Sequence, residues 1–96
     1  MSKKSELHLR NLEIFEWRFV HKTPTSEIAK KTGLAEFTIR NIVESHRARW
    51  NKTYNAICAG IGAKPVMVKI ENVNIYIEKA IQAWIDLHRV IIRFDK

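Results

Sequence analysis

Hydrophobic residues follow a helical spacing through the first part of the chain. Between about Glu6 and His21, one face collects five large apolar side chains: Leu9, Leu12, Phe15, Phe19 and Val20. A nearly opposite face carries a second set: Leu7, Ile14 and Trp17. This spacing predicts an α-helix, and its two apolar sides predict that the helix packs between two neighbours.

Local signals predict two more helices directly after the first. Thr23 can cap a helix and Pro24 suits the first helical position, so a second helix is expected over about residues 24–31. Gly33 is expected to end this helix, because glycine accepts the left-handed conformation of a tight turn. A third helix is then expected over about residues 36–50.

Helical patterns return on both sides of an ambiguous stretch in the second half of the chain. Residues 51–64 suggest a short helix that ends at Gly60 or Gly62. From Glu78 onward, a broad apolar stripe at helical spacing predicts a long amphipathic helix. The stripe consists of Ile77, Ala80, Ile81, Trp84, Leu87, His88 and Ile91.

The stretch between these two patterns, residues 66–77, alternates strictly between apolar and polar positions. One interpretation is a β-hairpin that turns at Glu71 and Asn72. The other is a short extended piece at residues 66–70, followed by a helix that starts near Asn74.

A motif stands out between Thr23 and Arg47, in the stretch TPTSEIAKKTGLAEFTIRNIVESHR. Ala29 is small at the point where helices two and three would cross, and Gly33 permits positive φ in the turn. Apolar side chains that would fill the corner and the shared core follow at Ile28, Leu34, Ile39 and Ile42. The motif resembles the helix-turn-helix superfamily of bacterial and phage DNA-binding proteins. Its SEIAKKTGLAEFTIRNI part is most similar to small repressors and to sigma-factor-type recognition domains.

The resemblance covers about a quarter of the chain and departs from the superfamily pattern at Ala35, where many such motifs have a capping Ser or Thr. The expected fold is mainly α, with a helix-turn-helix inside a three-helix core. A short extended or β-hairpin segment and a long amphipathic C-terminal helix follow. The single domain would comprise a flexible N-terminus at residues 1–5, a DNA-binding core at 6–50 and a C-terminal helical, dimerising part at 51–96.

Charge supports a polyanionic partner. The formal net charge is +7, and the first 52 residues hold 11 Lys and Arg against 6 Asp and Glu. The surplus is therefore concentrated in the half of the chain that contains the motif.

Other function classes find little support in the sequence. Four scattered histidines and the single Cys58 give no metal-ligand spacing, and no catalytic arrangement is visible, so neither a metal site, a cofactor nor an enzyme is expected. The longest apolar runs are too short to span a membrane, and MSKKSELHLR is not a secretory signal. A cytoplasmic location is expected.

The resemblance implies a sequence-specific transcriptional regulator of a bacterium, phage or plasmid, which reads duplex DNA with its third helix. The residues expected to face the base edges are Glu36, Phe37, Arg40, Asn41 and Glu44. In the major groove, arginine pairs with guanine, asparagine with adenine, a carboxylate with the cytosine amine, and an apolar side chain contacts the thymine methyl group.

Phosphate contacts are expected from the second helix and from the end of the third. The candidates are Lys22, Thr23, Thr25, Ser26, Lys31, Arg47, Arg49 and Lys52. If residues 66–77 form a hairpin, it would act as a wing with Lys64 and Lys69 as further phosphate contacts.

The apolar stripe of the last helix is wider than one neighbouring helix requires. It is expected to form a homodimer interface centred on Trp84, Leu87 and Ile91, while also closing the domain against the first helix. Two alternatives to a regulator stay open. One is a protein-interaction module on the same scaffold, favoured by Phe37 and Glu44. The other is an architectural DNA-binding protein in phage or plasmid packaging, replication or maintenance.

Overall fold

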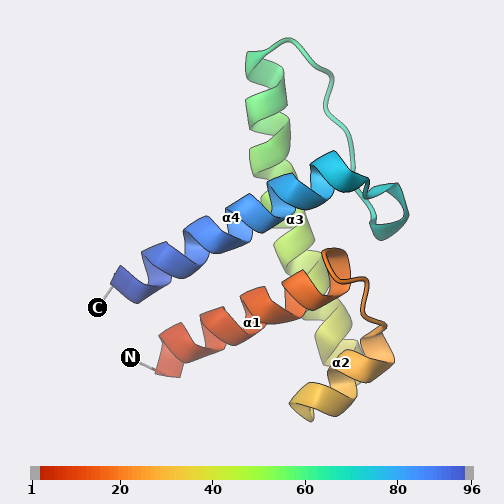
Figure 1. Ribbon diagram of the computed structural model, residues 1–96, viewed down its shortest axis with the longest axis vertical. Helices are drawn as coiled ribbons and strands as arrows, with labels where there is room; N and C mark the ends of the chain where they lie inside the picture. Colours follow the sequence, from red (N-terminus) through yellow and green to blue (C-terminus); the bar gives the residue numbers. More distant parts are fainter. Residues whose placement is uncertain (1–2, 95–96) are drawn as a thin grey trace.

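The computed structural model describes residues 3–94, and within this range the chain forms four α-helices and one 3-10 turn (Figure 1). The helices are α1 (Lys3–Phe19), α2 (Thr25–Thr32), α3 (Glu36–Gly60) and α4 (Ile75–Phe94), and the turn η1 spans Ile70–Asn72. No β-strand occurs among these residues, so the predicted mainly α class is confirmed. Figure 1 shows α1 and α4 side by side in opposite directions, both lying across α3.

α1 packs on both of its apolar sides, as its pattern predicts. On one side, Ile14 is fully buried with Ile28 of α2 and Ile39 of α3. On the other side, a larger cluster joins α1 to α3 and α4; its buried members are Leu12, Phe15, Phe19, Trp50, Val68, Ile81 and Ile85. α1 begins at Lys3, so residues 3–5 are helical where a flexible N-terminus was expected. Residues 1–2 of that expectation lie outside the described residues.

The turn between α2 and α3 has the predicted glycine geometry. Gly33 has φ 74° and donates its backbone N–H to the Ala29 carbonyl. The Thr32 hydroxyl donates to the Ile28 carbonyl at 2.8 Å and accepts the Leu34 N–H at 3.2 Å. These bonds fix the direction in which the chain leaves α2 and enters α3.

The prediction for the start of α2 is wrong in one detail. Pro24, and not Thr23, occupies the cap position, and its carbonyl accepts the backbone N–H groups of Glu27 and Ile28. Thr23 instead donates its backbone N–H to the Trp17 carbonyl at 2.8 Å, which ties the α1–α2 connection to the end of α1.

α3 is ten residues longer than predicted, because residues 51–60 continue it without a break. The proposed boundary between residues 50 and 51 therefore falls inside one helix. Within this continuation, the Tyr54 ring stacks on Trp50 with the ring centroids 4.9 Å apart. At the other end of α3, Ala35 makes no side-chain capping bond, as its missing polar group predicts.

The segment between α3 and α4 is extended and follows α3 back toward the domain core. Asn51 holds it from α3: its Oδ1 accepts the Val68 N–H at 2.6 Å, and its Nδ2 donates to the Val66 carbonyl at 2.8 Å. Asn55 accepts the Val66 N–H at 3.0 Å. Side chains of α3 thus take the place of a partner strand, so the β-hairpin interpretation is wrong and there is no wing for Lys64 and Lys69.

The second interpretation of residues 66–77 agrees with the structure. After η1, Asn74 caps α4, because its Oδ1 accepts the backbone N–H groups of Tyr76 and Ile77 at 3.0 and 2.9 Å. Between residues 3 and 94, none of the helices has the length and apolar content needed to cross a membrane.

Candidate nucleic-acid interface

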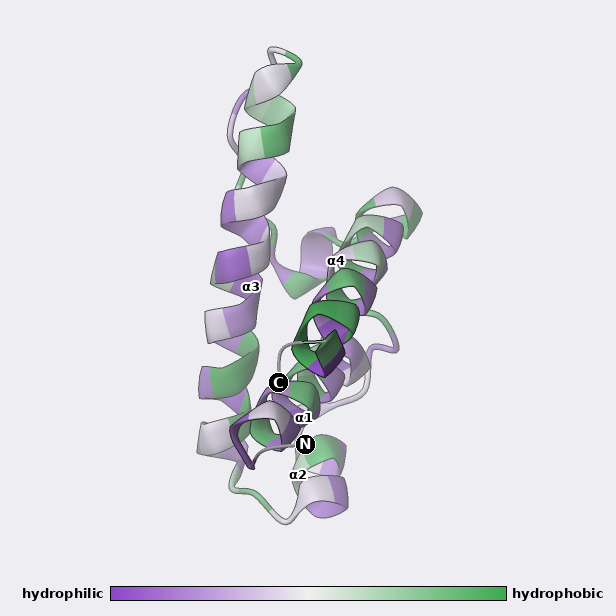
Figure 2. Ribbon diagram, turned by 90° about the vertical axis from the view of Figure 1, so that its left-hand side faces the viewer, coloured by the Kyte–Doolittle hydropathy of each residue, from purple (hydrophilic) through white to green (hydrophobic). Residues whose placement is uncertain are grey.

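The first half of α3 presents a long face that no other helix covers. Figure 2 shows α3 along one edge of the molecule, with α1, α2 and α4 all on the same side of it. The five residues predicted to read bases are all exposed on α3: Glu36, Phe37, Arg40, Asn41 and Glu44. Phe37 is 71% exposed and is the large apolar side chain of this face.

Ion pairs within α3 leave some of these residues available to a binding partner and occupy others. Arg40 lies 3.8 Å from Glu36, and both side chains are more than half exposed, so this pair is weak and easily exchanged for another partner. Glu44 accepts two hydrogen bonds from Arg47, at 2.9 and 2.5 Å. These bonds, above all, hold the pKa of the Glu44 carboxyl below its usual value. Glu44 is therefore already paired within the protein.

Arg47 has a structural position that the sequence does not reveal. Its side chain is only 11% exposed, and besides Glu44 it reaches the Asn51 Oδ1 at 3.4 Å and the Val68 carbonyl at 3.5 Å. Its donors are directed at the protein's own carbonyl and carboxylate groups. This placement argues against the predicted phosphate contact by Arg47.

A groove of about 450 Å³ runs beside the first half of α3, where α1, α2 and the segment around η1 meet it. Three cationic side chains line it together with Arg47: Arg18 from α1, Arg40 from α3 and Lys69 from the extended segment. Thr25, at the start of α2, also lines the groove. Of the predicted phosphate contacts, the structure places Thr25 and Arg47 in this groove.

Arg18 was missed by sequence reasoning, and Lys69 was considered only as part of a hairpin wing. A signal for Arg18 was present, because the last turn of α1 must lie close to the start of α2 when only five residues connect them. The location of Lys69 depends on the bonds from Asn51 and Asn55, which join positions 11 to 17 residues apart. No local pattern reports such bonds.

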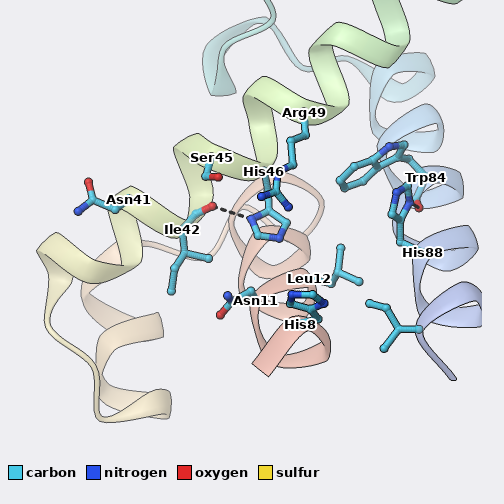
Figure 3. Close-up of a pocket in the computed structure, with 11 residues that line it drawn as sticks. His8, Asn11, Leu12, Asn41, Ile42, Ser45, His46, Arg49, Trp84 and His88 are labelled. Carbon is cyan, nitrogen blue, oxygen red and sulfur yellow. Dashed lines mark hydrogen bonds between the residues drawn. The ribbon is translucent and has the colours of Figure 1, made fainter. Parts of the chain in front are cut away.

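A second cavity, of about 460 Å³, lies on the opposite flank of α3, between α1 and α4 (Figure 3). Asn41, Ser45 and Arg49 of α3 border it, and His8 of α1 and His88 of α4 face them (Figure 3). Among the described residues that line this cavity there is no carboxylate.

His46 lies at the inner side of this cavity and is 8% exposed. Its Nδ1 bonds to the Ile42 carbonyl at 2.9 Å. Burial is the main cause that lowers the pKa of His46, and the nearby Arg49, His8 and His88 lower it further. The neutral imidazole is therefore the form that fits the folded protein.

The remaining predicted phosphate contacts are dispersed. Lys31 points back at α1, where its Nζ lies 5.3 Å from the centre of the Trp17 ring. Lys52 lies farther along α3, beside the extended segment, and Ser26 is exposed on α2. Lys22 is exposed in the α1–α2 connection with φ 59°.

The described part of the chain has no cluster of side chains suited to metal binding. Between residues 3 and 94, no group of three or more His, Cys, Asp or Glu side chains is arranged to hold a metal ion. Comparison of the chain with protein-family models, curated proteins and solved structures found no match.

Proposed function

We propose that this protein is a small cytoplasmic transcriptional regulator whose α2, turn and α3 form a helix-turn-helix that binds double-stranded DNA. In this proposal the first half of α3 enters the major groove. One observation carries it: the uncovered face of α3 has cationic side chains on both flanks. A helix in the major groove has a sugar-phosphate backbone on each side, so it needs positive charge at both edges and hydrogen-bonding groups between them.

The proposal assigns a role to each flank and to the face between them. Arg18, Lys69 and the start of α2 would contact one phosphate backbone, and Arg49 the other. Arg40 and Asn41 would pair with base edges, and Phe37 would contact a thymine methyl group. Glu44 takes no part in base recognition here, because Arg47 already occupies its carboxylate.

Selection from a random duplex library by the purified protein tests the proposal, followed by fluorescence anisotropy on the selected site. Arg40→Ala and Asn41→Ala should each cost roughly 1–3 kcal/mol and relax the preference at one base position. Arg18→Ala should weaken binding to all sequences and lower the salt dependence by about one ion. Lys79→Ala removes a matched exposed charge from α4 and should leave binding unchanged.

Selection that returns no preferred sequence would count against a regulator. If Arg40→Ala and Asn41→Ala also bind like the parent, α3 is not the recognition element. Sequence-independent binding that still falls steeply with salt would instead indicate an architectural DNA-binding protein.

A protein-interaction module is the second candidate function. The large exposed area of Phe37 favours it, because an apolar ring on a polar surface suits a protein partner as well as a thymine methyl group. Salt separates the two functions: DNA affinity should fall steeply between low and physiological salt, whereas an interface built on Phe37 should respond weakly.

The proposal includes a homodimer formed through α4. Dimeric helix-turn-helix proteins place two recognition helices about 34 Å apart, on successive major grooves. Of the three residues predicted at the centre of the interface, Leu87 and Ile91 are 57% and 51% exposed. Trp84 is half-buried, with its ring edge-on to Phe15 at 6.0 Å between centroids, so it belongs mainly to the domain core.

A further inference from the structure

α4 carries a regular row of apolar side chains that are exposed, except for Ala80, which packs partly against the core. The row consists of Tyr76, Ala80, Ala83, Leu87, Val90 and Phe94, and we call it the α4 seam. Tyr76 is 79% exposed and Phe94 82% exposed. The steps along the seam alternate between four and three residues, which is the spacing by which two helices pair side by side. Figure 2 shows the hydrophobic character of α4 along most of its length.

We propose that the α4 seam binds the same seam of a second copy of this chain, with the two α4 helices antiparallel. The inference deepens the homodimer included in the proposed function. It does not depend on DNA binding, because the seam lies on α4 and the proposed recognition face lies on α3.

The orientation follows from the two edges of the seam, which differ in chemistry. One edge is charged and exposed, with Lys79, Asp86 and Arg93. The other edge is apolar, with Ile77, Trp84 and Ile91. A parallel pair would set the charged edge of one helix against the apolar edge of the other. An antiparallel pair related by a twofold axis brings like edges together, so charges meet charges and Ile91 meets an apolar surface.

Charge complementarity also selects the register. If all six seam positions were aligned, Asp86 would lie beside Asp86 of the partner subunit, and Lys79 beside Arg93 of the partner subunit. Both contacts are repulsive. A shift by one heptad toward the C-terminus places Leu87 against Val90 of the partner subunit. It also places Asp86 beside Arg93 of the partner subunit. The twofold axis makes each of these contacts twice.

This register pairs the C-terminal part of the seam, from Ala83 to Phe94, and leaves Tyr76 and Ala80 outside the contact. Phe94 faces Ala83 of the partner subunit, so the bulkiest side chain meets one of the smallest. On the apolar edge, Ile91 approaches Trp84 of the partner subunit, whose ring is only partly covered within its own domain. The predicted interface residues therefore all lie in or beside the contact.

Sedimentation equilibrium of the full chain tests the dimer. The parent protein should show a concentration-dependent monomer–dimer equilibrium. Leu87→Lys should raise the dimer Kd about tenfold or more, because it places a charge in the contact. Ile57→Lys is the matched control, since Ile57 is 67% exposed on α3 and lies outside the seam. Circular dichroism checks that both variants keep the parent's helix content. A parent that stays monomeric up to about 1 mM would overturn the dimer.

Charge reversal tests the orientation and register. Asp86→Arg and Arg93→Asp should each weaken the dimer, and the double variant should restore it to within about threefold of the parent Kd. Asp86 also interacts with Arg89 and Gln82 of its own helix. A purely local effect of Asp86→Arg would not be rescued by Arg93→Asp, so failure of rescue overturns the register. Lys79→Asp should change the dimer Kd very little. A tighter dimer with Lys79→Asp would show the fully aligned register, and a weaker dimer would show a shift toward the N-terminus.

Discussion

α3 and α4 both leave one long face uncovered, but the two faces have opposite chemistry. The uncovered face of α3 mixes charged and amide groups around one aromatic ring, and cations border it on both flanks. The uncovered face of α4 is a continuous apolar row with charges at one edge only. A polar face costs nothing in water and gains from a polyanion, whereas an apolar face gains from being covered. One small domain thus presents two surfaces that suit two different kinds of partner.

The apolar core beneath α4 depends strongly on one side chain of α1. Phe15 is fully buried and contacts Phe19, His46 and Trp84. Phe15→Ala should lower the free energy of unfolding by about 3–5 kcal/mol, because it leaves a cavity at the junction of α1, α3 and α4. Leu7→Ala, on the same helix but 48% exposed, should have a much smaller effect. Chemical denaturation measures both, and equal effects would contradict the packing of α1.

The extended segment that carries Lys69 to the groove is held mainly by Asn51. Asn51→Ala removes both side-chain bonds to the segment and leaves the buried Val68 N–H without its acceptor. We expect a loss of about 1–3 kcal/mol in the free energy of unfolding, together with weaker DNA binding. Asn55→Ala removes a single, exposed bond and should cost less. If the two variants are equally stable, Asn51 does not hold the segment.

Acid should lower the folding stability of the domain through groups in the half that contains α4. The pKa of His46 is lowered below 6.5 in the folded protein, mainly by burial, so the unfolded chain takes up a proton more readily. This contribution to stability is complete above pH 6.5 and is lost as the pH falls below it. Below pH 4.5 a second loss should follow at Glu16, whose pKa is lowered mainly by its hydrogen bond from Arg89.

Unfolding curves measured at pH 8 and pH 5.5 check the histidine contribution. His46→Gln should reduce the change in the free energy of unfolding between these two pH values. His21→Gln, at an exposed position, should leave that change as it is in the parent protein. If the free energy of unfolding of His46→Gln changes with pH as much as that of the parent, another group causes the acid sensitivity.

A substitution confined to the exposed α3 face should change stability very little. Glu36→Gln removes the weak pair with Arg40, so stability should change by less than about 1 kcal/mol. Because it also removes a negative charge next to the proposed base contacts, DNA affinity should rise slightly at low salt. Anisotropy at two salt concentrations measures this rise. A marked fall in affinity would mean that Glu36 itself contacts a base.

Features that depend on neighbouring residues were the ones that sequence reasoning could predict. Gly33 and its left-handed turn, the uncapped start of α3 at Ala35 and the two apolar sides of α1 all follow from local preferences and helical spacing. The exposure of Arg40 and Asn41 follows in the same way, because Ile39 and Ile42 fix the inner side of the helix.

Features that depend on distant contacts were missed. Alternating residues 66–77 suggest a strand, yet the backbone groups of Val66 and Val68 are paired by Asn51 and Asn55. The helix predicted to end at Gly60 or Gly62 does end at Gly60, but the sequence did not predict that it continues α3 without a break. The sequence predicts that Arg47 is free to contact phosphate, whereas its side chain is bonded to Glu44 and to the Val68 carbonyl.

Arg47 also connects the surface proposed to face DNA with the extended segment before α4. One end of its guanidinium holds a carboxylate on the surface proposed to face DNA, and the other end reaches the backbone of the extended segment. If that segment moved away, Arg47 would lose its bond to the Val68 carbonyl but would keep both of its bonds to Glu44. The charge of the recognition surface is therefore insulated from movement of the connection before α4.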